Sequence, residues 1–294
     1  MVTKGSKSKK PPPDTRKKST EGGSSKLMKE LLKDYDMRAE LYETSPCLAI
    51  KKTLKKAIED ERLLTKFIFD PQDRKQVEYW DDEKFIKYFS GEVEERPQSA
   101  KRKKQRPKSF KDEKPLVKLL PLIEAIRAKR YLNIHEILVW DVHLEDSDMY
   151  ALAGLLSKSV YQIYRIELLD CFIDAKSLST FAPSVALSKT LRDLVLDFNG
   201  FGDKGCKVLC TYLLTCKWLV HLSLCFCDLG KQSGFFLGNL IVETPIRELY
   251  LDGNSLEAEG IIALTSNLAL AADNEAFERQ EEARLKLEAA ERAA

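Results

Sequence analysis

The fold is decided by five segments that follow one pattern: IHEILVWDVHL (134–144), IYRIELLDCFI (163–173), LRDLVLDFNGF (191–201), LVHLSLCFCDL (219–229) and IRELYLDGNSL (246–256). They begin 29, 28, 28 and 27 residues apart. A repeat of this length has room for one strand, one turn and one helix of about three turns. The sequence therefore predicts a series of stacked strand and helix units.

The apolar positions of each segment predict the core. The first, fourth and sixth positions are apolar in all five copies, and side chains two residues apart in a strand share a face. We therefore expect these residues to be buried: Ile134, Ile137, Val139, Ile163, Ile166, Leu168, Leu191, Leu194, Leu196, Leu219, Leu222, Leu224, Ile246, Leu249 and Leu251.

Two further features complete the unit. After each strand, apolar residues recur at helical spacing, from Met149 in the first unit to Leu268 in the last, and Gly205 and Gly260 stand where a turn into the helix is expected. The ninth position carries an amide or thiol that can bind backbone groups where the chain leaves the strand. These residues are Cys171, Asn199, Cys227 and Asn254, whereas the first segment has Val142.

This spacing and the alternation of Asn and Cys resemble the ribonuclease-inhibitor-like class of leucine-rich repeats, over about residues 131–270. The resemblance implies an α/β fold, in which a curved solenoid carries a parallel sheet on its concave side and helices on its convex side. It also implies a role in binding another macromolecule.

Composition divides the chain into five parts. They are a disordered basic tail (1–24), a helical N-terminal region (25–95), a disordered basic linker (96–114), the repeat domain with an N-terminal capping helix (115–270), and a charged C-terminal helix (271–294). In the repeat domain, LVKLLPLIEAIRAKRYL from Leu116 predicts the capping helix, which would cover the end of the solenoid.

The N-terminal region contains three predicted helices. One begins near Ser25; a second begins at Ser45 and Pro46 and runs to about Lys66, with Phe67 on its apolar face; a third is rich in aromatic residues and spans 82–89. These helices form either a separate docking unit or a cap on the first repeat, and the sequence leaves both possibilities open.

The linker contains KRKKQRPK (101–108), which has the composition of a surface that attracts polyanions. Its cations are Lys101, Arg102, Lys103, Lys104, Arg106 and Lys108. The interpretations are a solvated linker, a contact with an anionic protein surface, or nuclear import and nucleic acid. Nucleic acid is the least favoured because only Phe110 lies near the charges.

The sequence offers no pattern for catalysis or for a cofactor. The three histidines are scattered over the repeats, and no phosphate-binding glycine loop, nucleophile elbow or HExxH motif is present. Five of the seven cysteines lie from Cys206 to Cys227, but the repeat explains four of them as buried structural thiols rather than metal ligands. The fifth, Cys225, is expected on the concave face, where its thiol could be reactive. Without a long apolar segment or an apolar N-terminal signal, we expect a soluble, intracellular, non-enzymatic protein that does not bind membranes.

The concave sheet is the predicted binding surface, because its outward positions are not needed for the core. Acidic residues outnumber basic ones there by six to one, which suits a partner with basic residues. Trp140 is either an anchor for the partner or packed under the N-terminal cap. The third, fifth and seventh positions give Glu136, Leu138, Trp140, Arg165, Glu167, Leu169, Asp193, Val195, Asp197, His221, Ser223, Cys225, Glu248, Tyr250 and Asp252.

Two functions remain open at this point. The first is a scaffold or adaptor, and the basic N-terminus, short repeat block and charged C-terminal helix resemble several leucine-rich repeat proteins of cilia and the cytoskeleton. The second is a regulator that inhibits or activates an enzyme, such as a nuclease or a small GTPase.

Overall fold

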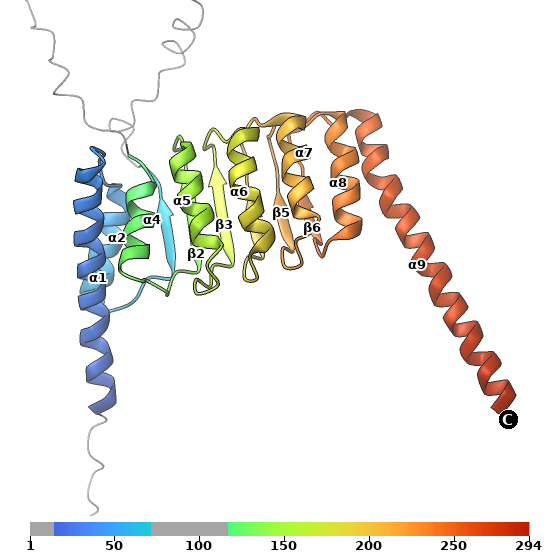
Figure 1. Cartoon of the computed structure of the whole chain (residues 1–294), viewed down its shortest axis with the longest axis horizontal. Helices are drawn as coiled ribbons and strands as arrows, with labels where there is room; N and C mark the ends of the chain where they lie inside the picture. The colour runs from blue at the N-terminus through green and yellow to red at the C-terminus, as the bar shows by residue number, and fades with distance from the viewer. Residues whose placement is uncertain (1–14, 72–116, 294) are drawn as a thin grey trace, which may run out of the picture.

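The computed structural model describes residues 15–71 and 117–293 (Figure 1). The first part of the basic tail, the aromatic helix expected at 82–89 and the basic linker at 96–114 lie outside the described residues. Within the described ranges, strands and helices alternate from residue 66 onward.

Six strands form one sheet in the order β1-β2-β3-β4-β5-β6, and every neighbouring pair is parallel. The register follows the repeat, so that Glu136 faces Arg165, Arg165 faces Asp193, and Asp193 faces His221. The α/β solenoid predicted from the sequence is therefore confirmed. The strands are β1 (Lys66–Phe69), β2 (Glu136–Trp140), β3 (Arg165–Leu169), β4 (Asp193–Val195), β5 (His221–Ser223) and β6 (Glu248–Tyr250).

A helix follows each strand from β2 onward and returns the chain to the start of the next parallel strand. Figure 1 shows these helices as a row on one face of the sheet. Neighbouring helices pack against each other, from α4 and α5 through to α8 and α9. The helices of this row are α4 (Leu120–Ala128), which precedes β2, and then α5 (Asp146–Leu156), α6 (Ala175–Leu187), α7 (Gly202–Leu213), α8 (Lys231–Glu243) and α9 (Glu257–Ala293).

The predicted core positions are buried in the first four repeats. The last repeat differs, because Leu249 and Leu251 are only half-buried and Ile261 and Leu268 on α9 are 52% and 51% exposed. No further strand pairs with β6 in the described part of the chain, so this end of the core meets solvent.

The N-terminal region corrects the sequence interpretation. Residues 66–69 form β1, which pairs with β2 so that Lys66 faces Glu136. The sequence pattern predicts the end of a helix at this segment. The helix α2 (Leu48–Glu59) instead ends early, Glu61 takes a positive φ of 51°, and the alternating segment KFIF buries Phe67 and Phe69.

The beginning of α2 also differs from the prediction. The residue that precedes the helix is Cys47 rather than Ser45, and its backbone N–H donates to the hydroxyl of Tyr35 at 2.7 Å. Tyr35 belongs to α1 (Thr15–Leu41), which begins ten residues before Ser25, within the segment expected to be disordered. The buried residues that fix α1, such as Met28 and Leu31, lie where the helical pattern was recognised.

The predicted capping role of the helix after Leu116 is wrong. This helix, α4, lies between α1 and α5 and follows β1 in the chain, so β1 and α4 form an additional coil ahead of the five recognised repeats. The segment between them is far longer than in the other coils. The end of the solenoid is covered by α1 and α2, which resolves the open choice in favour of a cap packed on the repeats.

The ninth-position amides hold adjacent coils together as the pattern predicts. The side-chain oxygen of buried Asn199 accepts from the N–H groups of Cys171 and Ile173, and its nitrogen donates to three carbonyls, among them that of Leu168 at 2.8 Å. Asn254 repeats this arrangement two coils later, in the last coil, where it is only half-buried.

Two glycines have a different role from the one expected. Gly205 and Gly260 lie inside α7 and α9 rather than in turns. A Cβ on Gly234 of α8 would lie 2.0 Å from the backbone oxygen of Gly260. Gly234 and Gly260 therefore allow α8 and α9 to approach closely. The turn into α7 is made instead by Gly202, with φ +61°.

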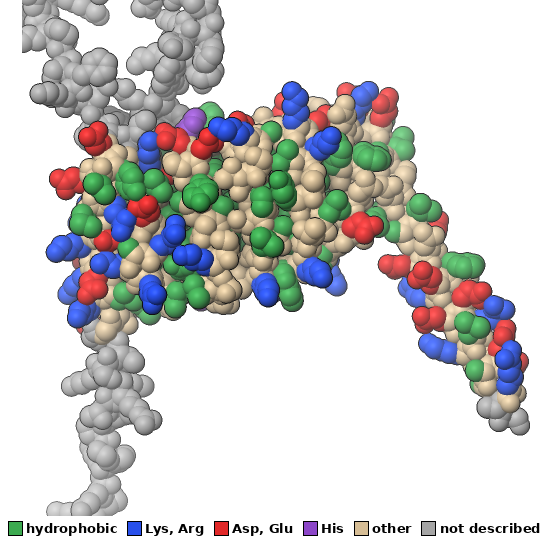
Figure 2. All heavy atoms as spheres, in the orientation of Figure 1, with side chains coloured by type: hydrophobic (Ala, Val, Ile, Leu, Met, Phe, Trp, Pro, Cys, Tyr) green, Lys and Arg blue, Asp and Glu red, His purple; other side chains and the backbone are tan. Residues whose placement is uncertain are grey.

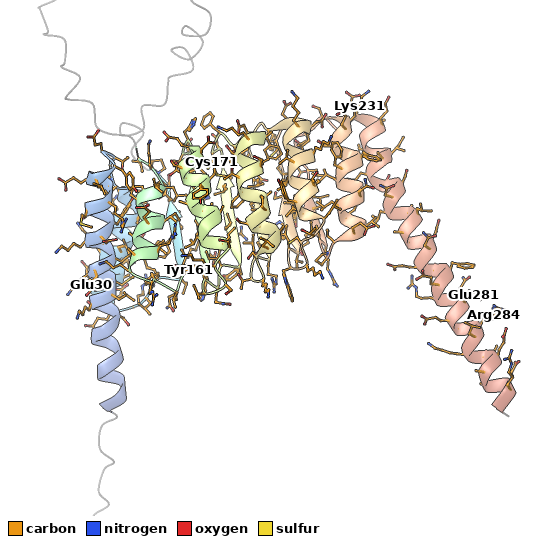
Figure 3. All side chains as sticks on the ribbon, viewed as in Figure 1. Glu30, Tyr161, Cys171, Lys231, Glu281 and Arg284 are labelled. Atoms are coloured by element: carbon orange, nitrogen blue, oxygen red, sulfur yellow. The ribbon has the colours of Figure 1, made fainter. Side chains whose placement is uncertain are left out.

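The last helix continues beyond the solenoid. Figure 3 shows Glu281 and Arg284 on the part of α9 that extends away from the repeats. They pair along the helix at 2.6 Å, and apolar residues of this part, such as Phe277 and Leu285, are exposed. This length of α9 is therefore stabilised by local pairs rather than by the core.

Candidate protein-binding face

The face of the sheet opposite the helices is called the open face below, and it carries the third, fifth and seventh residues of each repeat. Among the described residues, no helix covers it. All fifteen sequence-predicted positions lie on this face or at its edge, where the strands bring them into rows across the sheet.

The middle row differs from the prediction of freely exposed side chains. Leu138, Glu167, Val195 and Ser223 are only 3%, 9%, 7% and 6% exposed. They occupy the fifth position of successive repeats. This row contributes to the cohesion of the sheet more than to an accessible surface.

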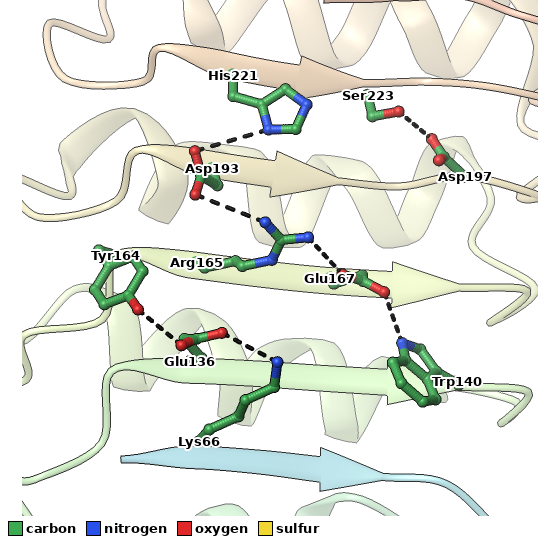
Figure 4. Close-up of polar contacts among 10 residues, drawn as sticks. All are labelled: Lys66, Glu136, Trp140, Tyr164, Arg165, Glu167, Asp193, Asp197, His221 and Ser223. Carbon is green, nitrogen blue, oxygen red and sulfur yellow. Dashed lines mark hydrogen bonds and ion pairs between the residues drawn. The ribbon is translucent and has the colours of Figure 1, made fainter.

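A polar network crosses the first strands (Figure 4). The indole N–H of Trp140 donates to Glu167 Oε1 at 2.8 Å, and Arg165 pairs with the other oxygen of Glu167 at 2.9 Å. This hydrogen bond is the largest cause that raises the pKa of Arg165. Trp140 therefore lies on the open face with its polar group already bound.

The network continues from Arg165 toward β5. The Asp193 carboxylate lies 3.9 Å from Arg165 and 3.7 Å from His221. Glu136 forms a separate cluster, in which the hydroxyl of Tyr164 donates to one of its oxygens at 2.7 Å and Lys66 lies 3.5 Å from the other. Most of the acidic side chains over β2 to β4 therefore have partners within the protein.

The carboxylate of Asp197 is also bound within the protein. It accepts from the Ser223 hydroxyl at 2.7 Å and from the backbone N–H of Cys225 at 2.9 Å. It therefore holds β5 against the end of β4, a role that the sequence analysis did not assign to it.

The last strand presents a different surface. Glu248, Tyr250 and Asp252 are exposed, and Tyr250 keeps 45% of its surface accessible while its ring meets His221 edge to face. Neither carboxylate forms an ion pair with a basic side chain in the described ranges. Two carboxylates without a paired cation thus flank an exposed aromatic ring on β6. Leu169, the apolar open-face position on β3, is half-buried.

Two residues of the network were missed in the sequence analysis. Lys66 lies on β1, whose distance from the next repeat breaks the period of 28, and Tyr164 occupies the second position, which was not expected to reach the open face. One pattern in the sequence could have predicted this contact. A tyrosine stands at the second position of one repeat, and an acidic residue stands at the third position of the repeat before it.

The cysteines behave as structural thiols. All seven are free, and six are buried; Cys225 alone is half-buried. Burial raises the pKa of Cys227 to about 12, and its thiol donates to the carbonyl of Leu196. In the described part of the chain, no group of three or more His, Cys, Asp or Glu side chains is arranged to hold a metal ion.

None of the helices in the described ranges is both long and apolar enough to span a bilayer. The predicted polyanion-binding cations, from Lys101 to Lys108, lie outside the described residues.

Comparison with known proteins agrees with this architecture. A family model for the leucine-rich repeat matches residues 187–210. The ribonuclease inhibitor of Sus scrofa is 30% identical over 150 residues, and that of Mus musculus is 28% identical over 151 residues. Each match covers 50% of this chain but only 32% of the inhibitor, so the chain spans about a third of the length of these curated relatives.

One solved structure shows a weaker likeness. Leiomodin-1 actin-binding site 2 aligns over 55% of this chain and 94% of its own, with 19% identity and a TM-score of 0.41, a level that carries no weight for function. The parallel sheet, the asparagine bonds between coils and the two inhibitor matches agree with one another. The chain therefore contains a solenoid of leucine-rich repeats, and its repeats are similar to those of ribonuclease inhibitors.

Proposed function

We propose that this protein is a non-enzymatic scaffold or adaptor that binds a protein partner through the open face of its solenoid, the side expected to be concave. The observation that carries the proposal is the surface of β6, where Glu248 and Asp252 flank the exposed ring of Tyr250 without a cation paired to them. A partner with Lys or Arg side chains would supply the missing charges, and Tyr250 would supply an aromatic anchor.

The rest of the open face supports this binding indirectly. Arg165, Glu167 and Trp140 are held in one hydrogen-bonded arrangement before a partner arrives. A surface that is already ordered loses little conformational entropy on binding. We therefore place the principal contacts around β5 and β6, with Trp140 as a secondary contact at the opposite end.

The setting of this scaffold is also a proposal. Its overall composition resembles leucine-rich repeat proteins of cilia and the cytoskeleton, and the cations from Lys101 to Lys108 would hold an anionic protein surface while the solenoid binds its partner. Stoichiometric recovery of the protein in a purified ciliary or cytoskeletal assembly would support this setting.

The test is a quantitative pull-down from cell extract. The intact chain is compared with the Trp140→Ala, Tyr250→Ala variant and with a Glu248→Lys, Asp252→Lys variant, after each is shown to fold. Tyr212→Ala with Glu243→Lys, on helices α7 and α8, is the matched control. Loss of the same protein set from both open-face variants, with retention by the control, supports the proposal. Identical sets from all variants contradict it.

A second candidate is a regulator of an enzyme, and the matches to ribonuclease inhibitors favour it. Titrating the chain into a ribonuclease assay separates the two proposals directly. Stoichiometric inhibition would favour the regulator, whereas unchanged activity at a large excess of the chain would favour the scaffold.

A further inference from the structure

The two edges of the solenoid differ in charge. The five loops that lead from a helix to the next strand, here called the basic edge, contain seven Lys or Arg residues and no acidic residue. They span 129–135, 157–164, 188–192, 214–220 and 244–247. The five loops that lead from a strand to the next helix show the opposite pattern, with seven acidic residues and no Lys or Arg.

Helix dipoles explain part of this separation. The basic edge lies at the C-terminal ends of α4 to α8, where cations stabilise a helix. This effect accounts for the sign of the charge. It does not account for the apolar side chains of the same loops.

Apolar side chains stand among these cations. Figure 2 shows blue and green side chains along the lower edge of the solenoid, beneath α4 to α8. Leu187 is 74% exposed at the end of α6, and four further apolar residues of this edge are exposed by 43% to 54%. They are Leu132, Val160, Leu214 and Trp218. Exposed apolar groups in a row of like charges indicate a contact surface.

Arg192 and Trp218 form the centre of the edge. The guanidinium carbon of Arg192 lies 5.1 Å from the centre of the Trp218 ring, and its Nη1 donates to the carbonyls of Lys189 and Leu191. No carboxylate in the described ranges pairs with Arg192, although the side chain is half-buried. A fixed guanidinium with unused N–H groups can accept a carboxylate in a bidentate pair.

The remaining cations extend the surface on both sides of this centre. Lys158, Lys189, Lys217 and Arg247 are exposed and form no ion pair with a described carboxylate. Each of the last four loops supplies one of these cations, so the charges form a row along the edge rather than a single cluster.

We propose that the basic edge docks an acidic protein segment that also carries apolar side chains. Its carboxylates would pair with Arg192 and with the lysines on either side, and its apolar side chains would cover Trp218, Leu187 and Leu214. This contact is separate from the open face, which is acidic and requires a basic partner. The protein could therefore hold two partners of opposite charge.

The chemistry of the edge favours a protein segment over other polyanions. A single-stranded nucleic acid would need several free aromatic faces, and one face of Trp218 is already occupied by Arg192. A bilayer would need a group of protruding apolar side chains, whereas most apolar side chains of the basic edge are only about half exposed.

The test is a fluorescence-anisotropy titration of the full-length protein with a labelled peptide of alternating Glu and Leu. A Lys-for-Glu version of the peptide is its control. We compare the intact chain with Lys189→Glu, Lys217→Glu and with Trp218→Ala. The matched control is Lys52→Glu, Lys55→Glu, which makes the same charge change at exposed positions of α2.

The linker cations must be separated from those of the edge. All titrations are therefore repeated with Lys101, Arg102, Lys103, Lys104, Arg106 and Lys108 replaced by Gln. We expect salt-sensitive binding of the acidic peptide in both backgrounds, weakened about tenfold by Lys189→Glu, Lys217→Glu and several-fold by Trp218→Ala, but unchanged in the α2 control.

Three results would overturn the proposal. One is the absence of peptide binding. Another is equal weakening by the edge and α2 variants, because that result would show a general charge effect. The third is edge-dependent binding to phosphatidylserine-containing vesicles or to poly-uridine RNA, with no edge-dependent binding to the peptide, because it would assign the edge to another class of ligand.

Discussion

Asn199 shows how one side chain joins two coils. It is completely buried, and its amide satisfies two backbone N–H groups of the preceding coil while donating to carbonyls of both coils. Asn199→Ala would leave these buried groups without partners, and we expect the free energy of unfolding to fall by about 3 kcal/mol. Urea denaturation at equilibrium measures this change.

Asn254 provides the matched comparison for that prediction. It makes the same bonds, but it is only half-buried in the last coil, so water can replace the lost partner. We expect Asn254→Ala to cost about 1 kcal/mol. Equal losses at the two positions would show that burial does not determine the strength of these bonds.

The cysteines give a residue-scale prediction that depends on pH. At pH 8 we expect a maleimide reagent to label Cys225 first in the native protein, because the other six thiols are buried. Burial raises the pKa of Cys227 to about 12, so its thiol remains protonated in the folded state. Mass spectrometry of the labelled peptides identifies the modified residues, and early labelling of Cys227 would contradict the prediction.

The same pKa sets the direction of a stability change. Because the folded-state pKa of Cys227 is higher than the ordinary thiol value, its contribution to stability is complete below about pH 8.5 and is lost as the pH rises through about 12. Cys227→Ala should therefore reduce the loss of stability across this alkaline range, as followed by urea denaturation at a series of pH values.

Single positions could be predicted where the repeat determines them. The buried residues and the ninth-position amides follow directly from the period, because the same geometry recurs in each coil. The pairings on the open face could not be predicted in this way. They depend on which side chains meet across strands, as when Tyr164 reaches Glu136 or when Asp197 binds the N–H of Cys225.

At the scale of the element, β1 is the strand that the sequence analysis missed. Its segment is short, follows a helix closely, and is separated from the next repeat by a stretch of about two coils in length, so neither the period nor the local pattern distinguished it. The structure shows that Phe67 is 1% exposed and meets Tyr131 edge to face at 5.8 Å. The strand therefore has the core residues of a coil.

This assignment can be tested at two adjacent residues. Phe67→Ala should lower the free energy of unfolding by about 3–4 kcal/mol, because it opens a cavity between β1, α4 and the cap. Ile68→Ala, on the open face and only half-buried, should cost about 1 kcal/mol. Thermal and urea unfolding of both variants checks the difference, and a helix over 66–69 would not produce this alternation.

At the scale of the whole molecule, the two ends of the solenoid differ. The first coil is covered by α1 and α2, and Arg38 of α1 binds Glu124 of α4 at 2.6 Å. At the other end, β6 has an unpaired edge among the described residues, and Ile261 and Ile262 of α9 are more than half exposed. In a solenoid each coil is stabilised mainly by its neighbours, so an end with one neighbour should open most easily.

We therefore expect hydrogen exchange to follow a gradient along the chain. Backbone amides of β6 and the first turns of α9 should exchange fastest within the solenoid, those of β3 and β4 slowest, and those of β1 at an intermediate rate because of the cap. Hydrogen exchange with mass spectrometry measures each coil separately. If β1 exchanged faster than β6, the cap formed by α1 and α2 would contribute less to stability than its buried contacts imply. A partner that docks at β6 would then bind the more stable end of the molecule.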